Sequence, residues 1–186
     1  MKWILPVLAC CVCVCGCSQQ NRELERGMQL RSALLSASEC RFHGEITADY
    51  GDEIYTFGAD CSADREGEIR FSVTAPETIA GIEGSISYSG GKLTFGDTAL
   101  QFSLLADDQL SPVAAPWVFL KSLRSGFLTS ACMEEELLRL SLNDSYEEGA
   151  LQTDIWLDAS DHPVRCDILY DGRRILSLNV SEFQIR

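Results

Sequence analysis

Short segments in which apolar and polar residues alternate, separated by tight turns, limit the folds open to this chain more than any other feature. The alternation is clear in residues 69–73, 100–104, 138–142 and 164–170. Because successive side chains of a strand point to opposite faces of a sheet, these segments predict strands with one apolar face each. The pair Asp171-Gly172 is the signal of a two-residue hairpin turn. The chain therefore predicts a mainly β protein with about nine antiparallel strands in one curved sheet.

Two segments have the spacing of helices instead. Residues 21–38 predict an amphipathic helix whose apolar side is formed by Leu24, Met28, Leu34 and Leu35. Residues 112–126 predict a short apolar helix, with Pro116 in its first turn and Gly126 at its end. Two short helices cannot cover about nine strands. We therefore expect a partly open half-barrel wrapped around an N-terminal helix and a plug helix, with an apolar groove left on the concave face.

The N-terminus has the layout of a secretory signal. Lys2 supplies a positive charge, residues 3–14 are mostly apolar, and a small residue, Gly16, precedes Cys17. The run 14–17 resembles a bacterial lipobox, in which the Cys receives acyl chains such as palmitate and becomes the first residue of the mature protein. We expect residues 1–16 to be a signal peptide, residues 17–21 a lipidated Cys and tether, and residues 22–186 a single domain. The alternative is an ordinary signal peptide that is rich in cysteine.

Charge and the lack of catalytic motifs restrict the function. The chain carries a net charge of −13, which opposes binding to nucleic acid and to anionic membrane surfaces. A lipid anchor must then provide the membrane attachment, at the extracytoplasmic face of the cell membrane. After the proposed anchor, the sequence has no phosphate loop, dinucleotide fingerprint, nucleophile elbow or Cys-x-x-Cys pair. We expect no enzymatic activity, no cofactor and no metal.

Four cysteines follow the proposed anchor: Cys40, Cys61, Cys132 and Cys166. An even number outside the cytoplasm favours disulfides, with three pairings to choose from. If Tyr50-Gly51 forms a two-residue hairpin loop, Cys40 faces Cys61 across the strands, and their disulfide stabilises the fold by about 3 kcal/mol. Cys132–Cys166 then follows by elimination.

A strand–turn–strand pattern in the first half of the chain resembles a known family. The pattern consists of residues 71–76 (Phe-Ser-Val-Thr-Ala-Pro), Ile79, Gly81, Ile82 and Gly84. It is similar to the LolA/LolB-like lipoprotein-carrier superfamily. The helix start at Ser111-Pro112 and the ending at residues 163–183 are similar to that family's plug helix and last two strands. The resemblance implies an unclosed half-barrel with helices inside and an apolar cavity that binds acyl chains. Some lipoproteins of this fold instead act as partners of cell-wall enzymes.

The resemblance implies a cavity lining. Its candidates are Trp117, Phe119, Leu120, Leu123, Phe127 and Trp156, and Tyr88 is a further aromatic for the groove mouth. Their alternative role is simply to fill the core. We expect a lipid-anchored, non-catalytic lipoprotein that binds a lipid or a lipoprotein acyl chain on the concave face. The alternative is a protein–protein module that docks and regulates an envelope or cell-wall enzyme.

Overall fold

One large antiparallel sheet organises the protein. The computed structural model describes the backbone of residues 5–102, 105–106, 109–147 and 149–186, and the side chains of residues 21–102, 110–147 and 149–186. In chain order the elements are α1 (Leu5–Ser36), β1 (Glu39–Asp49), β2 (Ile54–Asp64), β3 (Ile69–Ala75), β4 (Glu83–Ser87), β5 (Gly90–Phe95), β6 (Thr98–Phe102), β7 (Leu105–Ala106), β8 (Gln109–Leu110), a 3₁₀ turn (Pro112–Ala114), α2 (Ala115–Ser125), β9 (Phe127–Glu134), β10 (Leu137–Asn143), β11 (Gln152–Leu157), β12 (Pro163–Tyr170) and β13 (Arg173–Ile185).

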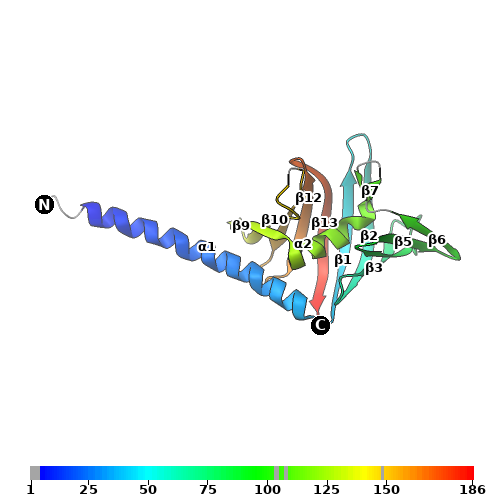
Figure 1. Cartoon of the computed structure of the whole chain (residues 1–186), viewed down its shortest axis with the longest axis horizontal. Coiled ribbons are helices and arrows are strands. Elements are labelled where there is room, and N and C mark those ends of the chain that lie inside the picture. Colours follow the sequence, from blue (N-terminus) through cyan, green and yellow to red (C-terminus); the bar gives the residue numbers. More distant parts are fainter. Residues whose placement is uncertain (1–4, 103–104, 107–108, 148) are drawn as a thin grey trace.

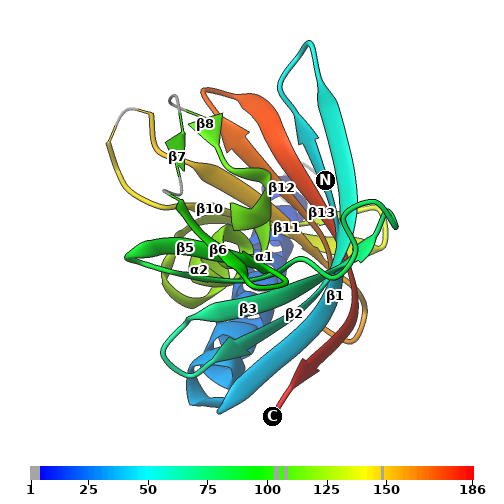
Figure 2. The same ribbon diagram turned by 90° about the vertical axis from the view of Figure 1, so that its right-hand side faces the viewer.

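Eleven strands follow the order β6-β5-β4-β3-β2-β1-β13-β12-β11-β10-β9, and β7 pairs only with β8. The edge strands β6 and β9 do not pair with each other, so the sheet stays open as it curves around the helices (Figures 1 and 2). The predicted curved antiparallel sheet around two helices is confirmed. The strand expected over residues 100–104 is β6, and its residues 103–104 lie outside the described part. The sequence prediction missed β9, because its apolar residues fall on both faces and Ala131 is its one buried residue.

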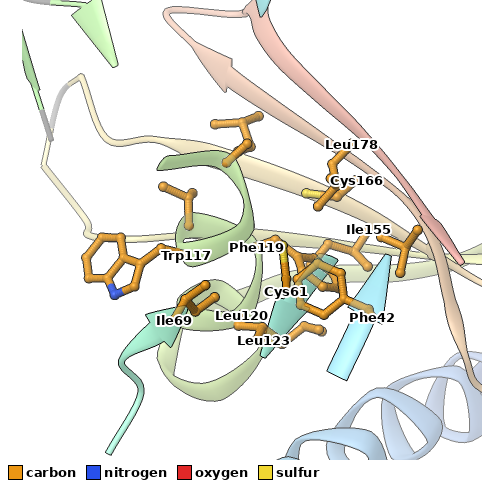
Figure 3. Packing of buried hydrophobic residues seen from close by; sticks show 14 of the residues in the cluster. Phe42, Cys61, Ile69, Trp117, Phe119, Leu120, Leu123, Ile155, Cys166 and Leu178 are labelled. Carbon is orange, nitrogen blue, oxygen red and sulfur yellow. The ribbon is translucent and has the colours of Figure 1, made fainter. Parts of the chain in front are cut away.

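The concave face of the sheet forms the core. Inward residues alternate with outward ones along β1, where Phe42 and Ile46 are buried. The helix α2 lies across this face (Figure 3). Its Phe119 is fully buried, with its ring edge against Phe42 at 5.4 Å between centroids. The plug helix predicted over residues 112–126 is therefore confirmed.

The two ends of the described domain meet in the middle of the sheet. Strand β1 pairs with β13, with Cys40 opposite Ile185. Beyond that pair, the backbone N–H of Ser38 donates to the Arg186 carbonyl oxygen at 2.8 Å. The first and last strands therefore join the two halves of the sheet.

The helix α1 buries a different side from the one predicted. Its buried line consists of Glu23, Gly27, Leu30 and Leu34, and buried Ala37 follows directly after the helix. In contrast, Leu24, Met28 and Leu35 are 43%, 46% and 52% exposed. Gly27 explains the rotation. A Cβ atom there would lie 3.0 Å from Leu140 Cδ2, so the absence of a side chain at Gly27 makes room for Leu140 of β10. The prediction that Leu24, Met28 and Leu35 share the buried side with Leu34 was wrong.

The predicted disulfides are not present among the described cysteines, and all four are free thiols. The hairpin register was wrong by two residues, because Asp49 pairs with Ile54 and the loop holds four residues. Cys40 therefore faces Ala63, and Cys61 faces Phe42.

The second predicted pair, Cys132–Cys166, is separated by the sheet itself. Cys132 shares a row with Arg139 and Arg165, whereas Cys166 lies in the row of Ala131 on the opposite face. Three strand spacings, about 14 Å, lie between the two strands, which is more than twice the usual Cα separation of a disulfide.

The N-terminal predictions are only partly covered by the described residues. Residues 1–4 of the predicted signal peptide lie outside them, and residues 5–17 belong to α1, with side chains that are not described. The backbone of α1 is helical without a break across position 17. Within the described residues, no helix is both long and apolar enough to span a bilayer. Lipidation of Cys17 and the cut before it stay predictions.

Candidate functional site

The predicted cavity-lining residues do not line one cavity. Phe119, Leu120 and Leu123 are buried in the core beneath α2 (Figure 3). They occupy the space on the concave face that the sequence prediction left as a groove. Trp117, one turn before Leu120, is 7% exposed and lies at the margin of this core.

Two of the predicted residues lie elsewhere. Trp156 is on the outer face of β11, where its ring stacks with the Arg165 guanidinium at 4.4 Å and its Nε1–H donates to Glu134 at 3.3 Å. Phe127 at the start of β9 packs its ring 4.1 Å from that of Tyr146. Neither side chain reaches the concave face that α2 fills.

A pocket opens where α1, α2 and the β4–β5 turn meet, and we call it the α2 pocket. Its volume is 260 Å³, and its lining includes Leu35, Tyr88, Trp117, Leu120, Lys121 and Arg124. Tyr88 is 68% exposed and meets the Trp117 ring edge-on at 5.2 Å. Leu35, which is also exposed, and Tyr88 therefore form an apolar wall that solvent reaches.

Basic groups surround the same opening. The Lys121 ammonium lies 5.2 Å from the centre of the Trp117 ring, a cation–π contact. Arg124 donates to the carbonyl oxygens of Asp64 at 3.1 Å and Arg65 at 2.8 Å, which fixes the β2–β3 turn against α2. Arg65 also lines the pocket, and Glu66 is its one acidic lining residue. An apolar wall with a basic rim suits an apolar tail that ends in an anionic group.

The sequence interpretation found part of this pocket. It named Trp117, Leu120 and Tyr88, and it missed Lys121 and Arg124. Both basic residues interrupt the apolar helix of residues 112–126 at positions three apart, and that spacing places them on one side of the helix. This signal was available, but the direction of that side depends on tertiary packing.

A larger and more polar groove crosses the outer face of the sheet, and we call it the outer groove. Its volume is 710 Å³. One row of paired residues runs through it across six strands: Gln184, Arg41, Ser62, Arg70, Ser85 and Lys92. Acids interleave with these bases in the lining, and one of them, Glu68, forms an ion pair with Arg70 at 3.4 Å. The outer groove is therefore lined by charges of both signs.

Three of the four described cysteines, Cys40, Cys61 and Cys166, have buried thiols. Burial raises the pKa of the Cys40 thiol to about 12 and also raises the pKa values of Cys61 and Cys166. These thiols stay protonated at neutral pH, and a protonated thiol is a poor nucleophile. No group of three or more His, Cys, Asp or Glu side chains in the described part of the chain could hold a metal ion.

Comparison with known proteins gives structural neighbours alone. No family model and no curated protein matches the chain. In structure it is similar to a putative outer membrane lipoprotein-sorting protein domain from Vibrio parahaemolyticus, with 11% identity, 86% of this chain and 91% of that chain covered, and a TM-score of 0.46. It is also similar to a LolA superfamily protein from Nitrosomonas europaea, with 9% identity and a TM-score of 0.46. That match covers 90% of this chain and 93% of that chain.

A third neighbour is the lipoprotein LppX from Mycobacterium tuberculosis, with 13% identity, 87% of this chain and 93% of that chain covered, and a TM-score of 0.42. One of these neighbours bears the name of the superfamily that the sequence resembles. Identities this low say nothing about the ligand or partner of this chain.

Proposed function

We propose that this protein is a lipid-anchored, extracytoplasmic, non-catalytic binding protein whose α2 pocket holds an acyl chain with an anionic end. The observation that carries the proposal is the α2 pocket itself, where exposed Leu35 and Tyr88 meet the basic rim of Lys121 and Arg124. In a chain with a net charge of −13, a local excess of positive charge beside solvent-reachable apolar side chains favours an anionic amphiphile.

The size of the α2 pocket limits the ligand further. Its 260 Å³ is just below the range of about 300–1,000 Å³ in which pockets enclose most of a drug-sized molecule. Two of its lining residues, Ala63 and Leu120, are buried residues of the core. The pocket therefore suits part of a single acyl chain, with the charged end at the rim, rather than a whole two-chain lipid.

Charge reversal tests the ligand assignment. Residues 18–186 would be titrated with a fluorescent fatty acid and, separately, with the fatty alcohol of the same chain length. Lys121→Glu should weaken fatty-acid binding by about tenfold, equivalent to about 1.4 kcal/mol, and should leave alcohol binding nearly unchanged. Lys92→Glu is the matched control, because Lys92 lies in the outer groove. Equal losses in both variants, or no uptake by the parent chain, contradict the proposal.

A separate experiment tests the anchor. The full chain would be expressed in a bacterial host with a labelled fatty acid, and label and membrane association would be followed for Cys17→Ser and for Cys15→Ser. We expect loss of both label and membrane association for Cys17→Ser alone. Retained label in that variant would show that Cys17 is not the acylated residue.

A second candidate function is the docking of an envelope protein. The outer groove supports it, because its 710 Å³ and its interleaved Arg41, Arg70 and Lys92 with acidic neighbours suit a polypeptide of mixed charge. Crosslinking in cells should then capture one partner in fixed ratio. That capture should be lost in Arg70→Glu and kept in Lys121→Glu, whereas a partner bound at the α2 pocket gives the reverse.

A further inference from the structure

An exposed apolar stripe runs along α1, formed by Leu24, Met28 and Leu35, and we call it the α1 stripe. These residues are about half exposed. Their spacing of four and seven residues keeps them within about 40° of one another around a helix. The neighbouring exposed side of α1 is polar and includes Glu25, Gln29 and Ser32. Arg31, between the stripe and the buried line, is held by α2.

The α1 stripe continues into the α2 pocket. Leu35 belongs to both, and the pocket adds exposed Tyr88 and the basic groups of Lys121 and Arg124. Apolar side chains and positive charges therefore meet on one side of the molecule. That combination is typical of surfaces that lie in the headgroup region of a bilayer, where apolar groups enter the acyl boundary and basic groups meet phosphates.

Position 17 is in line with this stripe. It precedes Leu24 by seven residues and Leu35 by eighteen, and with 3.6 residues per turn these separations are about two and five whole turns. The backbone of α1 is helical throughout this range, and its N-terminal half extends away from the sheet (Figure 1). Glu23, the first described buried residue of α1, follows position 17 by six residues, about 9 Å along the axis.

A helix this short between anchor and domain holds the domain against the surface in which the anchor is embedded. We propose that the α1 stripe and the rim of the α2 pocket form a membrane-docking face, with α1 lying parallel to the bilayer that carries the acylated Cys17. This inference rests on the proposed lipid anchor. It places the pocket mouth in the headgroup region, so that an acyl chain passes between bilayer and pocket without crossing water.

Depth-dependent quenching tests the docking face on the full-length acylated protein in vesicles of phosphatidylcholine and phosphatidylglycerol. In a Cys132→Ser background, which removes the exposed thiol, Met28→Cys and Gln29→Cys would each carry one fluorophore. Gln29 is the matched control, because it is exposed on the polar side of the same turn. We expect the Met28 label to lose most of its quenching by aqueous iodide and to gain quenching by brominated lipid. The Gln29 label should stay open to quenching by iodide and should show little quenching by brominated lipid.

Each other outcome overturns the inference in an identifiable way. If both labels are open to iodide on acylated, vesicle-bound protein, α1 stands away from the bilayer while the anchor remains valid. If the Met28 label is shielded without lipid quenching and the shielding rises with protein density, a second protein molecule covers the stripe. If mass spectrometry finds no acyl group on Cys17, the anchor fails and the docking face fails with it. Fatty-acid binding by residues 18–186 reports on the pocket independently of all three results.

Discussion

Replacing Arg31 by Ala is expected to lower the free energy of unfolding by about 2–4 kcal/mol, because one guanidinium joins the two helices. It donates to the carbonyl oxygens of Leu123 at 2.6 Å, Gly126 at 2.7 Å and Ser122 at 3.4 Å. The last carbonyls of a helix lack partners within it. Hydrogen bonds to a charged group contribute about 1.5–3 kcal/mol each, and a cation at a helix C-terminus adds up to about 1 kcal/mol.

Partial exposure of Arg31 reduces that total, and the range given for the substitution includes the reduction. Burial lowers the pKa of Arg31, but an arginine side chain stays charged at neutral pH. The charge–carbonyl bonds are therefore present under ordinary conditions. Arg31→Lys keeps the charge but loses the forked geometry that reaches several carbonyls at once, so its cost should be intermediate.

Urea denaturation followed by circular dichroism measures these differences. Arg22→Ala is the matched control, because Arg22 is an exposed arginine on the same helix, and it should change stability by less than about 0.5 kcal/mol. If Arg31→Ala costs no more than Arg22→Ala, the contacts of Arg31 do not hold α2, and the reasoning from its geometry is refuted.

Three further outcomes are expected. Phe119→Ala should lower the free energy of unfolding by about 3–5 kcal/mol in urea denaturation, because Phe119 is fully buried. Phe127→Ala should lower it by less than about 1 kcal/mol, because Phe127 is 40% exposed. Similar losses in the two variants would mean that the concave face is not filled. The buried thiols lose their protons only in the unfolded chain above about pH 9, so stability should fall as pH rises, by up to about 1.4 kcal/mol per pH unit for each thiol. Cys61→Ala should reduce that slope, and an unchanged slope would contradict the raised pKa. Gly84→Ala should cost about 1–3 kcal/mol, because its Cβ would lie 2.5 Å from Phe71 Cζ and 2.7 Å from the Lys92 carbonyl oxygen; an unaffected denaturation midpoint would show that β4 can shift away.

The elements that were predicted well are those in which local signals agree. Pro116 and Gly126 lie at the start and end of α2 as expected, because proline fits the first helical turn and the helix stops before glycine. Asp171 and Gly172 have φ of 49° and 71°, the left-handed values that a type I′ turn requires. Both signals act over a few residues and need no tertiary context.

The errors arose where distant contacts decide. The β1–β2 hairpin has clean alternation under either loop length, because a shift of two residues keeps every side chain on its own face. Alternation therefore could not separate a two-residue loop from the observed four-residue loop. The face of α1 was misjudged for a related reason. The sequence offers two adjacent apolar lines, and close approach at Gly27 decides which of them is buried.

The sequence predicted which kinds of residue form the candidate site, but it did not predict where in the fold the site lies. Large apolar residues in residues 112–126 were expected to line a cavity, and most of them fill it instead. Trp156 was assigned to the concave face. Its neighbour along the strand, Ile155, is fully buried on that face, so Trp156 faces the other way. Since neighbours along a strand face opposite ways, the choice depended on knowing which of the two faces is concave.

The pairing of β1 with β13 has a consequence for how the protein acquires its structure. The strand that joins the two halves of the sheet is the last to be synthesised, and its partner is the first strand of the chain. Contacts this far apart in sequence slow folding, because a long loop must close before they form. The halves β1–β6 and β9–β12 have no backbone pairing with each other except through β13, residues 173–185. The pairing that joins the two halves of the sheet is therefore also the one that forms latest, so refolding of the chain should be slow for a protein of its size.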